Sequence, residues 1–451
     1  MRSFGGGMKT INMRLVSLIA LVWALMFLPF LYGFASARMG LFPQKVIDSA
    51  IKELDTIKSG AVEKGPPEGY SRTTQTRTVT QQRPDAMSPG MTLIAGVGPK
   101  SRLSAWIVQP DGVVLHRWDL DWFTLWPNPD HLDPVNRPKA RPGTDIHGML
   151  LEPNGDLTFL FDRQGMMKVD VCGAVKWRLP LRTHHGFDRD DAGNFWVLGL
   201  RNHAAPRADL PNYKPPFAED EVLKVSPDGK LLQRFSIFTM LQDNDLRGLL
   251  YMASRENKST VGTEDMLHSN DIDVFRAGMA PGLAQVGDVM ISLRNLNSVV
   301  IFDPKTHKIK RVVTGHFVRQ HDPDFVDGWT LRVFDNNNVG LDHAHGSSRI
   351  VEYSLKTDTS KILFQGTKAV PFYSQLMGKQ DRLANGNLLI SEPGGARAFE
   401  IDPQGAMVWQ YVNIQKPGLA GIVDEAQRIT PETLSPEKLK SLAKACPAKA
   451  G

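Results

Sequence analysis

The chain has 451 residues, of which 41% are hydrophobic and 22% charged, an ordinary globular balance that allows one large or two ordinary domains. The formal net charge of +5 arises from 53 basic and 48 acidic residues without a long basic block, so no nucleic-acid partner is predicted. The chain has only two cysteines, Cys172 and Cys446, which are too few for a disulfide framework or a cysteine-rich zinc site. They could form one disulfide or remain two unpaired thiols.

The first predicted element is the apolar segment 15–37, which has no charged residue and follows a basic cytoplasmic flank at 1–14. A helix of this length spans roughly 35 Å, enough to cross a hydrocarbon core of about 30 Å. Ala35-Ser36-Ala37 has the form of a cleavage site, but the apolar run is longer than a usual secretory signal, which favours an uncleaved transmembrane signal anchor. We therefore expect a membrane-anchored protein whose body lies on the periplasmic or extracytoplasmic side.

Residues 38–90 predict a juxtamembrane helix followed by a linker. Apolar residues recur at helical spacing within 43–60, whereas 69–90 is polar and lacks a core pattern. We interpret the second stretch as an extended stalk.

From residue 91 onward the chain alternates between two kinds of β-hairpin. The first kind has alternating apolar residues around an Asp, Pro or Gly turn, and its six copies lie at 105–118, 166–179, 221–235, 298–312, 349–364 and 397–411. The second kind falls between them and carries a turn glycine, at Gly155, Gly193, Gly287, Gly328 and Gly386. Each pair of hairpins supplies four antiparallel strands, which is typical of one β-propeller blade.

The fold class is therefore predicted as all-β, with a six-bladed β-propeller over residues 91–413. The first blade lacks its innermost strand, so closure must take a strand from elsewhere in the chain, and the sequence does not identify it. Residues 414–451 are expected to form a C-terminal tail with a loop and a short amphipathic helix.

Histidines precede four of the five hairpins that carry a turn glycine. His147, His185 and His321 lie seven or eight residues before the glycine of their hairpin, and His268 lies nineteen before its own, across an insertion. The innermost strands of a propeller all begin at one end of the central channel, so residues at equivalent repeat positions converge there. We expect these histidines to form one site.

The end of each returning strand lies beside the start of the first strand of its hairpin. In the fourth blade this position holds Arg294, whereas Asp162 and Asp335 stand there in other blades. Imidazoles with one guanidinium predict a basic pocket for a small anion, because the guanidinium fork matches tetrahedral oxyanions. Several imidazoles also suit zinc or iron, but the arginine disfavours a cation, so no metal and no cofactor are predicted.

Several stretches resemble the bacterial-type arylsulfate sulfotransferases, and the resemblance covers most of residues 145–412. They are HHGFDRDDAGNFWVLG, LHSN, SLRNLNSVVIFD, RQHDPDF with VFDN, SRIVEYSL, and NGNLLISE with RAFEIDPQGAMVWQY. The resemblance implies a six-bladed propeller that transfers a sulfuryl group from a phenolic sulfate ester to a phenol through a sulfated histidine, without a nucleotide sulfate donor.

The resemblance also implies roles for individual residues. The Gln-His-Asp element matches His321, the implied nucleophile, while Arg294 would hold the sulfuryl oxygens and His268 would exchange a proton with the phenolic oxygen. The expected catalytic residues are His321, His268, Arg294 and His185, and the expected substrate-binding residues are Asn270, His147 and His184.

The predicted partners are a phenolic sulfate donor, a phenolic acceptor and, through the N-terminal helix, the membrane; a homodimer stays open. The alternative function is a non-catalytic propeller that binds a ligand or a protein at the membrane surface. A metal-dependent hydrolase ranks third, because Asp162 and Asp335 are the only obvious acidic candidates facing the channel.

Overall fold

The computed structural model describes residues 13–39, 42, 66–211, 213–252, 265–339 and 347–447. The chain divides into two compact units, Met1–Pro66 and Pro67–Gly451. In the first unit, α1 (Met13–Met39) contains a 21-residue stretch that is long and apolar enough to cross a membrane. The predicted N-terminal apolar helix is thus present, and it has the properties of a membrane anchor or a signal sequence. The juxtamembrane helix expected at 43–60 lies outside the described residues.

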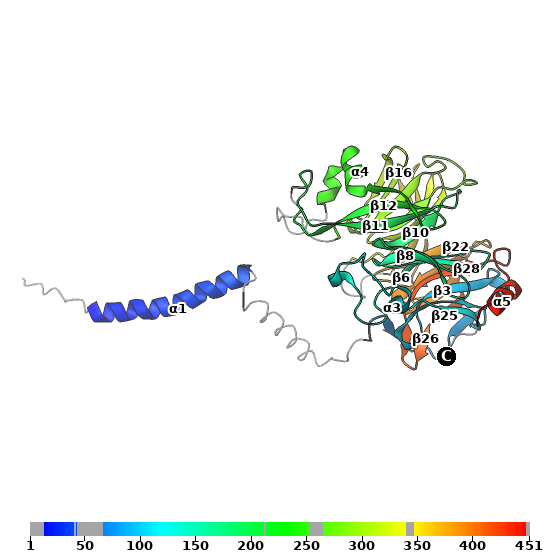
Figure 1. Cartoon of the computed structure of the whole chain (residues 1–451), viewed down its shortest axis with the longest axis horizontal. Helices are drawn as coiled ribbons and strands as arrows, with labels where there is room; N and C mark the ends of the chain where they lie inside the picture. The colour runs from blue at the N-terminus through cyan, green and yellow to red at the C-terminus, as the bar shows by residue number, and fades with distance from the viewer. Residues whose placement is uncertain are drawn as a thin grey trace, which may run out of the picture. The chain divides into compact units, whose positions relative to one another are not determined.

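The second unit is an all-β structure of antiparallel sheets, and the described part contains six sheets of four or five strands (Figure 1). The first sheet contains β28 (Val423–Ile429), β3 (Met91–Val97), β4 (Leu103–Val108) and β5 (Val114–Asp119). The second contains β6 (Ile146–Leu151), β7 (Leu157–Phe161), β8 (Gly165–Val169) and β9 (Val175–Leu179). The third contains β10 (Thr183–Arg189), β11 (Phe195–His203), β12 (Phe217–Val225) and β13 (Leu231–Ser236).

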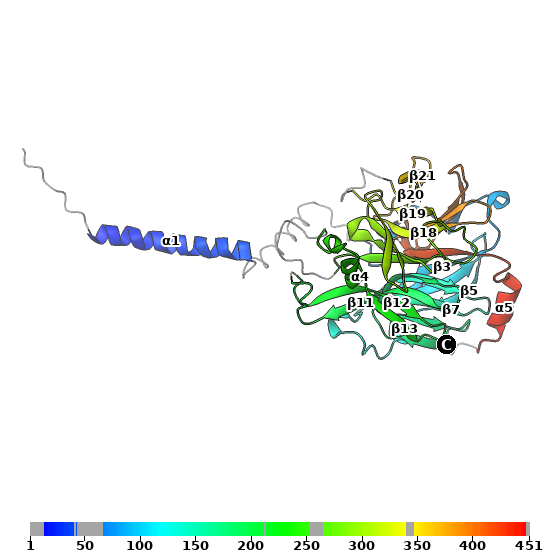
Figure 2. The ribbon, with the colours of Figure 1, turned by 90° about the horizontal axis from the view of Figure 1, so that it is seen from above.

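The fourth sheet contains β14 (Ser269–Val274), β15 (Val289–Leu293), β16 (Ser298–Asp303) and β17 (Lys308–Thr314). The fifth contains β18 (His321–Asp327), β19 (Thr330–Asp335), β20 (Arg349–Ser354) and β21 (Thr359–Gln365), which follow one another in this order in Figure 2. The sixth contains β22 (Lys379–Arg382), β23 (Leu388–Glu392), β24 (Arg397–Ile401), β25 (Met407–Val412) and β2 (Val79–Gln82). Both kinds of predicted hairpin thus occur as antiparallel strand pairs. Short helices accompany the sheets, namely α3 (Trp122–Leu125), α4 (Ile237–Asp243) and α5 (Pro436–Lys444).

The missing strand of the first sheet comes from near the C-terminus. Strand β28 pairs antiparallel with β3, from Val423 opposite Gly96 to Ile429 opposite Met91. The expected tail 414–451 therefore contains a strand of the sheets as well as the short helix α5. The strand was hard to recognise because its sequence, VDEAQRI, is rich in polar residues that become buried only in the assembled structure.

Part of the expected stalk also belongs to the sheets. Strand β2 pairs with β25 at the edge of the sixth sheet, and β1 (Tyr70–Arg72) forms a small sheet with β27 (Leu419–Gly421) and β26 (Ile414–Lys416). The side chains of β2 are half-buried or exposed. An edge strand of this kind needs no apolar alternation, which is why the polar stretch 69–90 suggested a linker.

Apolar side chains fill the space between neighbouring sheets. The middle strands β7 and β16 are buried almost throughout, because a sheet covers each of their faces. One apolar cluster joins Trp106 of the first sheet to Leu389 and Trp409 of the sixth, so these two sheets are neighbours although they lie far apart in the sequence.

The first strands of the six sheets also lie next to one another. Contacts join β6 to β10, β10 to β14, β14 to β18, β18 to β22, β22 to β28 and β28 to β6. The heads of these strands are therefore brought to one place in the molecule, which is where the predicted histidines stand.

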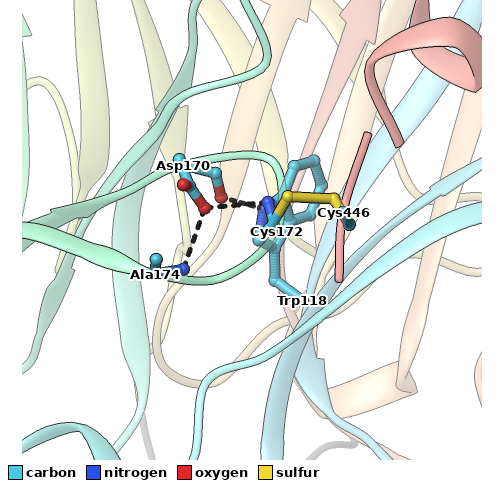
Figure 3. Close-up of a disulfide and its surroundings, with 5 residues drawn as sticks. All are labelled: Trp118, Asp170, Cys172, Ala174 and Cys446. Atoms are coloured by element: carbon cyan, nitrogen blue, oxygen red, sulfur yellow. Dashed lines mark hydrogen bonds between the residues drawn. A yellow bond between two sulfur atoms is a disulfide. The ribbon is translucent and has the colours of Figure 1, made fainter. Parts of the chain in front are cut away.

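The two cysteines form a disulfide between Cys172 and Cys446, which are 274 residues apart in the sequence (Figure 3). The turn that carries Cys172 is fixed by Asp170, whose carboxylate accepts the backbone N–H groups of Cys172 and Ala174 at 2.8 Å each. The indole of Trp118 donates to the carbonyl oxygen of Asp170 at 3.0 Å. The bridge therefore fastens the segment that follows β28 and α5 to the β8–β9 turn.

Loss of this disulfide is expected to lower the free energy of unfolding by about 2–5 kcal/mol, because the crosslink closes a very long loop in the unfolded chain. The measurement is a denaturant titration of the full chain in detergent, with and without a reducing agent. The Cys172→Ser variant should unfold at the lower midpoint under both conditions. An unchanged midpoint after complete reduction would contradict the expectation.

Candidate active site

The heads of the innermost strands carry β-bulges. The pairing register skips between Ile146 and Met149, His184 and Phe187, Ser269 and Asp271, His321 and Asp324, and Val423 and Glu425. At the same places the backbone enters the left-handed region, with φ of 58° at His185, 49° at His268 and 48° at Asp322. A bulge re-aims side chains, and non-glycine residues keep such angles only where the surroundings enforce them. The bulges therefore turn the strand heads toward a common centre.

The structure brings the predicted histidines together at this centre. The ring of His185 lies 5.3 Å from that of His147, 5.1 Å from that of His184 and 4.8 Å from that of His268, measured between centroids. His321 faces the same narrow cavity as His147 and His185. The cavity has a volume of about 20 Å³ and is lined by His147, Gly148, His185, Asn270, His321, Asp322, Met377, Gly378, Lys379, Asp424 and Glu425. It has room for about one water molecule.

His321 is held in a defined orientation. Its Nδ1 lies 2.6 Å from Oδ1 of Asn336, whose amide nitrogen donates to the carbonyl oxygens of Ser374 and Met377. Because the amide nitrogen is used in this way, Asn336 presents an acceptor to His321, and the proton of the imidazole lies on Nδ1. Nε2 therefore carries the lone pair, and it accepts the backbone N–H of Met377 at 3.2 Å.

The surroundings keep His321 neutral. Burial lowers the pKa of His321 well below its ordinary value, and the nearby charge of Arg294 acts in the same direction. The unprotonated ring nitrogen is the nucleophilic form of histidine, so the ring is available for attack at neutral pH.

Arg294 and Asn270 stand beside the histidines with unused polar atoms. Arg294 is the first residue of the η5 turn (Arg294–Leu296), and its backbone N–H donates to the carbonyl oxygen of His268 at 3.1 Å. Its Nε is buried and has no hydrogen-bond partner within the described residues, and the same holds for Oδ1 of Asn270 and Nε2 of His268. Buried polar atoms without protein partners are rare in folded proteins, so these atoms are suited to contact a polar ligand.

Asp162 and Asp335, which occupy the position of Arg294 in other hairpins, differ in their surroundings. Oδ1 of Asp162 accepts the backbone N–H of His185 at 3.0 Å and lies 3.8 Å from Nδ1 of both His147 and His185. Neither aspartate lines the cavity, and the carboxylate of Asp335 accepts hydrogen bonds from the Arg349 side chain and from two backbone N–H groups. Asp335 is therefore a structural residue of the fifth sheet.

His147, Asp162 and His185 are close enough to share a cation, since their ligand atoms all lie within 4.8 Å of one another. However, Asp162 already accepts a backbone N–H, and Nε of Arg163 lies 3.8 Å from its other oxygen. Burial alone would raise the pKa of Asp162, but His147, His184 and Arg163 outweigh burial and lower the pKa. Guanidinium groups at this distance favour an anion over a cation.

Several residues of this region were not predicted from the sequence. Asn336 lies within VFDN, to which no role was assigned, and Arg163 stands one position beyond the residue that aligns with Arg294. Asp265, whose Oδ2 lies 2.5 Å from Nδ1 of His268, precedes the His-x-Asn element by three residues and gave no signal of its own.

Acidic residues on the innermost strands were not predicted from the sequence either. They stand on the innermost strands and include the buried Asp271, Asp273, Asp322 and Glu425 and the half-buried Asp324. Lys379 lies 2.7 Å from a carboxylate oxygen of both Asp271 and Asp322. Burial opposes the charge of Lys379, but the two carboxylates outweigh it and raise its pKa well above the ordinary value. The alternation in NDIDV and HDPDF was the signal that could have predicted this acidic lining.

A larger cavity of about 670 Å³ lies elsewhere and is lined by none of the predicted residues. Its Arg397 is paired with Glu392 at 2.5 Å. The histidine centre, with its unpartnered buried atoms, is therefore the stronger candidate site.

A family model described as arylsulfotransferase (ASST) matches residues 148–414, more than half of the chain. The chain belongs to the arylsulfotransferase family. The matched range of this arylsulfotransferase-family protein includes His184, His185, His268, Arg294 and His321 and begins directly after His147. No curated protein matches the chain.

Several solved structures resemble the protein at low identity. A Bacteroides caccae protein of unknown function is 14% identical with a TM-score of 0.44, covering 75% of this chain and 98% of that one. An inactive Staphylococcus aureus virginiamycin B lyase variant with quinupristin is 11% identical with a TM-score of 0.38, covering 77% and 89%. The WD40 β-propeller domain of Doa1 is 10% identical with a TM-score of 0.38, covering 80% and 96%.

Proposed function

We propose that this protein is an aryl-sulfate sulfotransferase that moves a sulfuryl group from a phenolic sulfate ester to a phenolic acceptor through a sulfohistidine. Membership of the arylsulfotransferase family supports sulfotransferase-type chemistry in general. The observation that carries the mechanism is the state of His321, whose Nδ1 is bonded to Asn336 and whose Nε2 is left as an unprotonated nucleophile.

In the first half of the reaction, Nε2 of His321 attacks the sulfur atom of the donor. The bond between sulfur and the phenolic oxygen breaks and its electron pair stays on that oxygen. The oxygen takes a proton from Nε2 of His268, which enters this step as the imidazolium with its second proton on Nδ1. Arg294 binds the sulfuryl oxygens, where charge is redistributed in the transition state. For this step the backbone N–H of Met377 must give up its hydrogen bond to Nε2 of His321.

In the second half, Nε2 of His268 accepts the proton of the acceptor phenol. The phenolic oxygen attacks the sulfur atom, the nitrogen–sulfur bond breaks, and its electron pair returns to His321. The buried amide of Asn270, together with His147 and His185, lines the cavity around the transferred group, and His184 contacts His185 through their Nδ1 atoms. No cofactor takes part in this scheme.

We further propose that the scaffold is a six-bladed β-propeller held at the membrane by α1, with its body on the extracytoplasmic side. The six-bladed arrangement is supported by the contacts between the first strands of neighbouring sheets. Strand β28 contacts both β22 and β6, so the series of contacts returns to the sheet where it began. The apolar cluster between the first and sixth sheets agrees with it. Support for the anchor comes from the length and hydropathy of α1.

The experiment uses the full chain purified in detergent and incubated with p-nitrophenyl sulfate, with and without phenol. Nitrophenolate release that depends on phenol, together with a protein adduct of about 80 Da on intact mass, is the expected ping-pong result. If folded protein shows neither nitrophenolate release nor the adduct with several phenolic donors, a non-catalytic propeller that binds a ligand or a protein is the better interpretation.

A further inference from the structure

Asp265 forms a short hydrogen bond with the proposed proton-transfer residue. Its Oδ2 lies 2.5 Å from Nδ1 of His268, and the side chains are 31% and 9% exposed. Nε2 of His268, on the opposite side of the ring, is buried and has no partner within the described residues. The ring therefore points one nitrogen at a carboxylate and the other at the histidine centre.

The carboxylate of Asp265 is ionised at neutral pH. Burial alone would raise its pKa, but the hydrogen bond from His268 and the charges of Arg163 and Arg294 outweigh burial and bring the pKa below its ordinary value. An ionised carboxylate is a strong acceptor for an imidazole N–H.

The segment that contains Asp265 and His268 is hydrogen-bonded to the turn that contains Arg294. The Asn295 side chain donates to the carbonyl oxygen of Asp265 at 2.8 Å, and the backbone N–H groups of Arg294 and Asn295 donate to His268 and Leu267, each at 3.1 Å. Leu267 is fully buried in an apolar cluster. Both Asp265 and His268 have left-handed backbone angles, with φ of 85° and 49°. This conformation costs free energy in a non-glycine residue and is typical of positions that a site requires.

No other histidine around the cavity has a carboxylate partner at hydrogen-bond distance within the described residues. His184 and His185 face each other through their Nδ1 atoms at 2.8 Å. His147 and His185 are 3.8 Å from the nearest oxygen of Asp162, and His321 is bonded to a neutral amide. The ionised partner therefore distinguishes His268 from its neighbours.

We propose that Asp265 is the positioning residue of the acid–base step, holding His268 so that Nε2 carries the transferred proton; this inference rests on the proposed sulfotransferase function. Asp265 accepts the Nδ1 proton in both halves of the reaction and keeps it there. When Nε2 donates its proton to the departing phenolic oxygen, the positive charge of the imidazolium disappears. When Nε2 takes the proton of the acceptor, the charge returns and Asp265 stabilises it.

The test compares donors whose leaving groups differ in basicity. The p-nitrophenolate ion is a weak base and departs without much help, whereas unsubstituted phenolate needs a proton as it leaves. In Asp265→Asn, transfer from phenyl sulfate is expected to fall by about 100-fold, and transfer from p-nitrophenyl sulfate by less than about tenfold. A plot of log kcat/KM against leaving-group basicity should therefore become steeper, and Asp265→Glu should recover most of the wild-type slope.

Two controls separate positioning from folding. Asp228→Asn, at an exposed turn, should keep wild-type rates and slope, and thermal unfolding reports whether each variant is folded. The double variant Asp265→Asn with His268→Ala should be no slower than His268→Ala alone. If Asp265→Asn does not fold, Asp265→Ser is measured on the same donor series.

An equal fall on all donors, or additive losses in the double variant, would overturn the role of Asp265 while leaving the sulfotransferase function standing. A wild-type chain that transfers no sulfuryl group from any donor would instead overturn the proposed function itself.

Discussion

Replacement of His321 by alanine is expected to abolish sulfuryl transfer and the protein adduct together, with a fall in kcat/KM of about 10,000-fold or more. The reason is that Nε2 of His321 is the atom that would bond to sulfur, and the remaining groups around the cavity can only bind or exchange protons. The measurement is phenol-dependent nitrophenolate release, followed by intact mass after incubation with the donor alone.

A matched control is His307→Ala, because His307 lies on the β16–β17 turn and its ring stacks on Phe235, away from the cavity. This variant should form the adduct and transfer sulfate at the wild-type rate. An adduct that persists in folded His321→Ala protein would show that another residue is the nucleophile.

Replacement of Arg294 by methionine is expected to lower kcat/KM by about 100- to 1,000-fold, because one donor to developing charge is worth roughly 3–4 kcal/mol in a buried site. Nε of Arg294 is buried without a partner within the described residues, so this N–H can donate to the sulfuryl oxygens, whereas one terminal nitrogen lies 3.5 Å from Oδ1 of Asn295. Arg294→Lys keeps the charge but loses the planar fork, and its rate should lie between those of Arg294→Met and wild type.

The same variant should change the pH dependence of the reaction. Burial and the positive charge of Arg294 both lower the pKa of His321. Burial still lowers the pKa after the substitution, but one of the causes is gone, so the pKa of His321 rises and the acid limb of the pH–rate profile moves to higher pH. Arg382→Met, at a largely exposed site, is the control for loss of an arginine. An acid limb that stays in place, with a rate close to wild type, would contradict the role of Arg294.

Strand pairing was predictable because hairpin signals are local. Alternating apolar residues around a turn determine a strand pair within about fifteen residues, and all six hairpins of the first kind occur as predicted. The histidine positions were readable for the same reason, since they stand at fixed offsets from the turn glycines. Residues such as Asn336 and Asp265 act only through a partner that approaches in space, and a single sequence carries no mark of that approach.

The apolar N-terminal helix, the succession of hairpins and the histidines at their heads could be predicted from the sequence alone, because each depends on spacing along a short stretch. The folded chain was needed to show that β28 completes the first sheet and that Cys172 and Cys446 pair. It was also needed to show that bulged strand heads bring His185 and His268 together and place the charge of Arg294 near His321. These contacts join segments up to hundreds of residues apart, and they form because burial of the apolar faces between sheets brings the strands together.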